Sequence, residues 1–145
     1  MYQDYEMEFS SNQDVGQTVG SYISTNLVDI GSGNLAKNIG SGAPIQVVSS
    51  VTEAVAGGAS STVEVVAFVN DTENLTGRTD IASSGAIPVA NLGLGEQISL
   101  TLPASHPGFD DANRRYLGIV YIVAGATTTA GTMTSRGTVD PQSNS

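Results

Sequence analysis

Few residues of this chain could do acid–base or nucleophilic chemistry, and they lie apart in the sequence. His106 is the only histidine and stands beside Ser105 in the segment PASHPGFDDANRR. A hydrolase needs a nucleophile, a base, an orienting acid and an oxyanion hole that converge from separate segments. Neighbouring side chains of an extended chain point apart, and the chain has no cysteine to supply a thiol nucleophile. The sequence therefore predicts that the protein is not an enzyme.

Two short polar clusters carry the oxygen ligands that Ca²⁺ prefers. They are Asp110, Asp111 and Asn113 in one segment, and Asn70, Asp71, Glu73 and Asn74 in the other. Neither cluster has the spacing of a calcium-binding loop, and Asp and Asn are also ordinary turn residues. We therefore expect no metal ion and no cofactor.

The segment GSGNLA, residues 31–36, matches the dinucleotide fingerprint and follows a predicted strand. That fingerprint requires a helix directly afterwards, because the helix N-terminus holds the pyrophosphate. Gly40, Gly42 and Pro44 leave no room for such a helix. Lys37 lacks the following Ser or Thr of a phosphate-binding loop. We expect this segment to be a loop without a nucleotide.

The charge of the chain excludes some partners. Fourteen acidic and five basic residues give a net charge of −9, whereas nucleic acid binding needs clustered Lys and Arg. No apolar run approaches the roughly 18 residues of a membrane span. The first residues, MYQDYEMEFS, lack the apolar core of a signal peptide. We expect a protein made in the cytoplasm that binds neither nucleic acid nor membrane.

Only 13% of the residues are charged, which is about half the usual proportion. The polar surface must therefore come mostly from Ser, Thr, Asn and Gln. Such a surface costs little to desolvate and suits extensive protein contacts. An ordinary β domain with loops rich in small residues would have the same composition.

Short runs of β-forming residues, interrupted by Gly, Ser, Asn or Pro about every ten residues, predict an all-β sandwich or barrel. No segment keeps a helical period over ten residues. The count of eight or nine strands indicates an antiparallel jelly-roll β-sandwich of about eight strands. We expect one domain over residues 1–140 and a flexible tail at 141–145. The predicted strands are YEMEF, SYISTNLVDI, PIQVVSSV, STVEVVAFV, TDIAS, AIPVA, QISLTLP, RRYLGIVYIVAG and GTMTSRGTV.

The run RRYLGIVYIVAG, residues 114–125, is apolar on both faces of the predicted strand. One face can enter the core of the domain, but the other needs loops, the N-terminal arm or another subunit to cover it. We expect a homo-oligomer, either dimer or trimer. The residues expected at its interfaces, with arginines as partners of acidic surfaces, are Tyr116, Val120, Ile122, Arg114, Arg136, Val66 and Phe68.

Three runs of the sequence resemble the jelly-roll cement, or decoration, proteins of tailed bacteriophage capsids. They are STNLVDIGSG (24–33), SSGAIPVANLGLGEQISLTLP (83–103) and RRYLGIVYIVAGATTTAGTMTSRGTV (114–139). The resemblance implies a virion protein on the outer surface of the capsid that ties major capsid subunits together. The chain departs from the family at Val120 and Ile122, because the corresponding strand is usually more polar on that face.

Two other functions are compatible with a β-sandwich of this composition. A glycan-binding module would stack sugar rings on exposed aromatic side chains, for which Tyr22 and Tyr116 are the candidates. A fimbrial or surface-layer subunit would need a secretion signal, which the first residues lack.

Overall fold

A computed structural model describes residues 8–29, 45–102 and 116–139 of the chain. Within these ranges the chain forms ten strands and one short 3₁₀ turn, η2 (Val89–Asn91). The strands are β1 (Glu8–Asp14), β2 (Gly20–Ile23), β3 (Val28–Asp29), β4 (Ile45–Gly57), β5 (Thr62–Asn70), β6 (Thr79–Ser83), β7 (Ile87–Pro88), β8 (Gln97–Thr101), β9 (Tyr116–Ala124) and β10 (Thr128–Val139).

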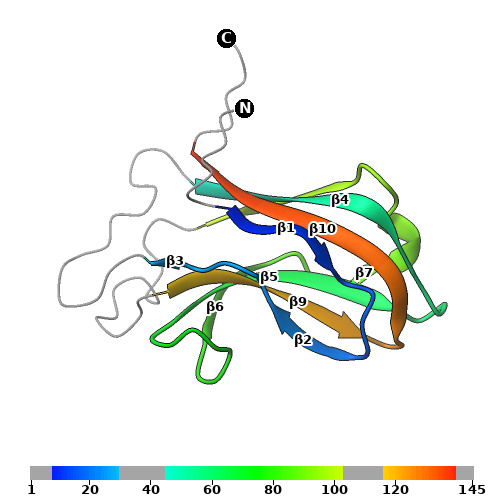
Figure 1. Ribbon diagram of the computed structural model, residues 1–145, viewed down its shortest axis with the longest axis horizontal. Helices are drawn as coiled ribbons and strands as arrows, with labels where there is room; N and C mark the ends of the chain where they lie inside the picture. Colours follow the sequence, from blue (N-terminus) through cyan, green and yellow to red (C-terminus); the bar gives the residue numbers. More distant parts are fainter. Residues whose placement is uncertain (1–7, 30–44, 103–115, 140–145) are drawn as a thin grey trace, which may run out of the picture.

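The strands form two antiparallel sheets that pack as two layers (Figure 1). The first sheet has the order β1-β10-β4-β8, and the second has the order β2-β9-β5-β6. The short strands β3 and β7 pair with β9 and β5 at the margins of the second sheet. Strands near the two ends of the chain pair with each other, and strands nearer its middle pair with each other. The pairs are β1 with β10, β2 with β9, β4 with β8 and β5 with β6. This winding of a folded-back chain is a jelly roll, which confirms the predicted fold class.

The main core lies between the two sheets and follows the alternation of side chains along the strands. In β9, Leu117, Ile119 and Tyr121 point into this core, as the sequence predicts. They meet side chains of the first sheet, including Phe9 and Met133. Burial of this apolar surface is what drives the two sheets together.

A hydroxyl network crosses the core and links the sheets. The Tyr121 hydroxyl on β9 forms hydrogen bonds of 2.5 Å with Oγ of Ser10 on β1 and of Ser135 on β10. The Oγ of Ser135 also lies 2.7 Å from Oγ of Ser49 on β4. All four residues are fully buried, so the network satisfies polar groups that would otherwise be costly in the core.

Two of the predicted strands are interrupted or shortened in the structure. The run SYISTNLVDI (21–30) is not one strand, because Ser24–Leu27 separates β2 from β3. The run AIPVA (86–90) forms the two-residue β7 and the start of η2. In both places local hydrogen bonds compete with the sheet ladder: Ser24 Oγ donates to the carbonyl of Asn26, and Leu92 N donates to the carbonyl of Val89.

Candidate functional site

The outer face of the second sheet is covered by loops of the same chain. Val66, Phe68 and Val120 lie on this face and are only 1%, 0% and 0% exposed. They form a second apolar cluster, against which Ile23, Leu27, Leu75 and Ile122 pack. These three residues, expected at an interface, are therefore buried within the single chain, and their assignment to an interface stays a prediction. The sequence shows that this face needs a cover but not which segment supplies it.

The other residues expected at an interface lie on both sheets, where the structure describes them. Ile122 is partly buried beside the second cluster, and Tyr116 is partly buried at the start of β9. Arg136 belongs to the first sheet, where its Nη2 lies 3.0 Å from Oε2 of Glu8 in an ion pair. Arg114 lies outside the described residues. The structure therefore divides the predicted set between the two sheets.

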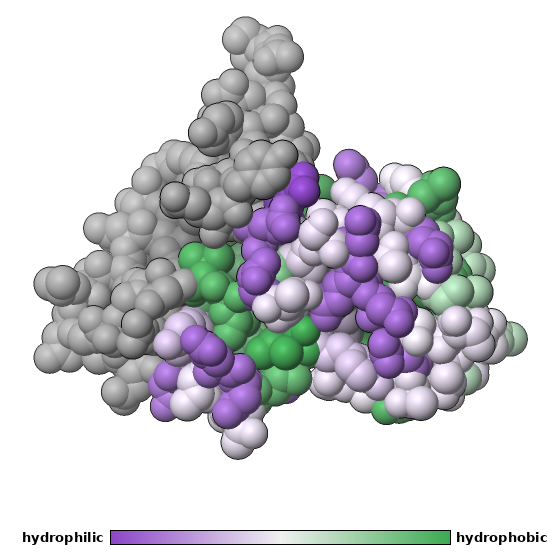
Figure 2. Space-filling model, viewed as in Figure 1, coloured by the Kyte–Doolittle hydropathy of each residue, from purple (hydrophilic) through white to green (hydrophobic). Residues whose placement is uncertain are grey.

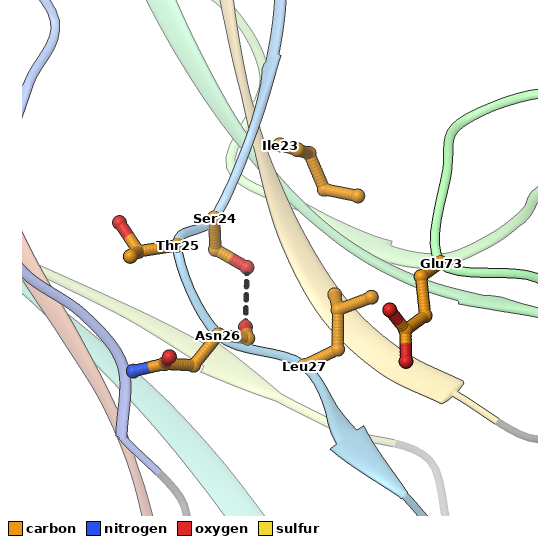
Figure 3. A pocket seen from close by; sticks show the side chains of 6 residues that line it. All are labelled: Ile23, Ser24, Thr25, Asn26, Leu27 and Glu73. Carbon is orange, nitrogen blue, oxygen red and sulfur yellow. Dashed lines mark hydrogen bonds between the residues drawn. The ribbon is translucent and has the colours of Figure 1, made fainter.

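The segment Ser24–Leu27 supplies one part of the cover, and hydrogen bonds fix its path. Ser24 N donates to the carbonyl of Ile119 at 2.7 Å, and Ile119 N donates to Ser24 Oγ at 3.1 Å. Ser24 Oγ donates to the carbonyl of Asn26 at 2.9 Å (Figure 3). Asn26 N donates to the carbonyl of Phe9 on the first sheet at 2.8 Å. This segment carries Leu27 onto the outer face of β9.

Gly118 makes room for Leu27 on that face. A Cβ atom at this position would lie 2.3 Å from Cδ2 of Leu27 and 2.9 Å from Cζ of Phe68. The glycine in RRYLGIVYIVAG therefore leaves the space that the covering leucine fills.

Gly118→Ala is expected to destabilise the domain by about 1 kcal/mol or more, because the added methyl displaces Leu27 or Phe68 from a packed site. Urea unfolding measures the change. Gly93→Ala is the matched control, since a Cβ there meets no atom within 4 Å and its φ is not positive. The control is expected to be neutral or slightly stabilising. Equal urea midpoints for Gly118→Ala and the wild type would contradict this account of Leu27.

The loop between β5 and β6 supplies a second part of the cover. It contains one of the two predicted oxygen-ligand clusters. Asn70 is fully buried, and its Nδ2 donates to the carbonyls of Asn74 at 2.7 Å and Thr76 at 2.9 Å. Asn74 Oδ1 accepts from Thr76 N at 3.0 Å. These amides shape the turn that places Leu75 over the sheet. In the described part of the chain, no three His, Cys, Asp or Glu side chains lie close enough together to hold a metal ion.

A groove made of two adjoining hollows runs between residues 13–27 and the β5–β6 loop. Its larger hollow has a volume of about 600 Å³, and a smaller one of about 260 Å³ adjoins it at Ile23 and Glu73. Figure 2 shows apolar surface in a hollow of this face, beside polar residues. In Figure 3, Leu27 and Glu73 face each other from the two covering segments. The residues lining the two hollows are Gln13, Asp14, Gln17, Ser21, Tyr22, Ile23, Ser24, Thr25, Asn26, Leu27, Glu73, Asn74 and Leu75.

The remaining sequence candidates for chemistry lie outside the described residues. These are Ser105 with His106, the cluster at 110–113 and the glycine-rich segment 31–37. Among the described residues, no helix has the length and apolar character that a membrane crossing requires.

The fold and this face define an all-β jelly-roll domain with a groove built by its own loops on one sheet. The Bbp16 family model matches residues 9–136, which is most of the chain, and the protein therefore belongs to the Bbp16 family. No curated protein matches the chain.

Proposed function

We propose that the protein is a capsid cement protein, which binds the outside of an assembled bacteriophage shell and bridges its major capsid subunits. The observation that carries this proposal is the position of the runs that resemble such proteins. The run 83–103 forms much of the stretch from β7 to β8, and the run 114–139 forms β9 and β10. These elements complete both sheets of a jelly roll, the fold that the resemblance implies.

The surface chemistry supports the same function. Sparse charge and abundant small polar residues allow broad contacts with low desolvation cost. Bound from outside, a homo-oligomer would present the same contact surface to several shell subunits, with each copy adding to the total affinity. The partner is the major capsid protein, the site of action is the outer surface of the capsid, and assembly takes place in the host cytoplasm.

The proposed mechanism is linkage between binding and shell stability. A ligand that binds only the assembled shell stabilises it by about 2.7 kcal/mol per site when its free concentration is a hundred times its Kd. Neighbouring shell subunits form the full binding surface only after assembly. We therefore expect tight binding to expanded shells and weak binding to unassembled capsid protein.

Heat treatment of bare and decorated shells tests the proposal. Shells that carry the protein are expected to break at a higher temperature than shells without it, as measured by calorimetry and by electron microscopy of the heated samples. Bovine serum albumin at the same concentration controls for crowding, which has only a weak effect. Equal heat resistance of bare and decorated shells would contradict the cement function.

A further inference from the structure

We propose that the groove between residues 13–27 and the β5–β6 loop binds an extended protein segment in which an aliphatic side chain is flanked by Arg or Lys. The inference deepens the proposed function and rests on it only in naming the major capsid protein as the owner of this segment. The chemistry of the recognised segment follows from the groove itself.

The floor of the groove is apolar and fits an aliphatic side chain. Ile23 and Leu75 line the larger hollow, and Leu27 lines the smaller one beside Ile23. All three are only partly buried, although they pack on the second cluster. The larger hollow falls within the range of roughly 300–1,000 Å³ that is typical of binding clefts. An aliphatic residue placed there would remove this remaining apolar surface from water.

The negative charge of the groove favours a Lys or Arg next to the aliphatic residue of the bound segment. Asp14 and Glu73 line the larger hollow, and none of the other residues that line it is a cation. The two arginines in the described ranges pair elsewhere, Arg78 with Asp80 and Arg136 with Glu8. No described residue pairs with the Glu73 side chain, so the groove keeps an acidic rim that complements Arg or Lys.

The hydrogen bonds within the groove argue against a sugar as its ligand. Gln13 Nε2 donates to the carbonyl of Ile23, and Gln13 Oε1 accepts from Thr25 N. The Tyr22 hydroxyl donates to the carbonyl of Thr18 at 2.7 Å. A sugar needs several free donors and acceptors that converge on its hydroxyls, whereas these groups are already used within the chain. The groove therefore offers apolar surface and negative charge more than free hydrogen-bonding groups.

Both walls of the groove are held in place before a ligand arrives. Ser24 ties one wall to β9, and Asn70 ties the other to the end of β5. Both residues are buried. A preformed site loses less entropy on binding, which favours recognition of a short segment.

Two pairs of variants test the groove by their binding to bare shells. Glu73→Gln removes charge from the rim and is expected to weaken binding about tenfold, the usual effect of losing one charge-assisted contact. Glu96→Gln is its matched control, because Glu96 is an exposed carboxylate in the loop before β8, away from the groove.

Ser21→Arg places a cation in the groove and is expected to weaken binding about a hundredfold. Ser99→Arg, at an exposed serine of the first sheet, controls for the added charge.

Short overlapping peptides of the major capsid protein identify the segment directly. The peptide that binds is expected to contain an aliphatic residue beside Arg or Lys, and Ser21→Arg is expected to abolish its binding. Circular dichroism of every variant checks that the fold is kept; both groove substitutions are at exposed positions, so their folding is not at risk.

The results of these experiments distinguish a failure of the groove proposal from a failure of the cement function. Wild-type binding to shells that neither Glu73→Gln nor Ser21→Arg weakens would overturn the groove and leave the cement function standing. Failure of the wild type to bind any shell would remove the cement function, while peptide binding that Ser21→Arg abolishes would still support the groove. Binding to a glycan array that is lost in Ser21→Arg, without peptide binding, would assign the groove to a sugar and overturn the inference.

Discussion

Val120→Lys is expected to unfold the domain. Val120 is fully buried on the outer face of the second sheet, beneath the covering segments that carry Leu27 and Leu75. Burying an unpaired ammonium group costs several kcal/mol, against a total stability of roughly 5–15 kcal/mol for a domain. Circular dichroism and urea unfolding measure the loss. The same substitution would leave the fold intact if a second subunit, and not the chain itself, covered this residue.

Ile122→Lys is the matched control for this experiment. Ile122 lies on the same face of β9 but is only partly buried. A lysine there can extend its charged end to water while its stem packs on the cluster. We expect a loss of about 1–2 kcal/mol and a folded protein. A Val120→Lys protein as stable as the Ile122→Lys protein would show that the covering segments open easily.

Tyr121→Phe is expected to destabilise the domain by about 1–3 kcal/mol, because it removes two buried hydrogen bonds between the sheets. Ser10 and Ser135 lose their link to β9 but keep hydrogen bonds within the first sheet. The ring itself stays packed, so the secondary structure is expected to be unchanged. Urea unfolding at neutral pH measures the loss, and a midpoint equal to that of the wild type would show that the network adds no stability.

The same variant has an expected effect at alkaline pH. Burial raises the pKa of Tyr121 above its ordinary value, although the hydrogen bonds from Ser10 and Ser135 oppose the rise. The unfolded chain therefore releases this proton first as pH rises above about 10. The stability due to the neutral phenol is fully present below that pH and is lost as pH rises towards the folded pKa. Tyr121→Phe is expected to lose less stability than the wild type as pH rises above about 10; parallel curves would contradict this.

Much of the fold is determined by local sequence patterns. The alternation in RRYLGIVYIVAG sets which side chains of β9 share a face, because side chains alternate across any strand. Frequent Gly, Ser, Asn and Pro residues mark the turns, so the all-β class and the approximate strand number follow. The sequence also showed that the face of Val66, Phe68 and Val120 needs a cover. These features depend on neighbours in the chain, which a sequence displays directly.

The cover and the groove were decided only by the tertiary structure. Leu27 reaches Gly118 because hydrogen bonds between Ser24 and Ile119 join segments that are distant in the sequence. Asn70 and Asn74, which by type could bind calcium, shape the loop that carries Leu75. Asp14, at the end of β1 in the first sheet, and Glu73, in the loop after β5 of the second sheet, line one groove although they are far apart in the sequence. Strand order and register create these long-range contacts. The alternation of apolar residues along a strand specifies neither the order nor the register.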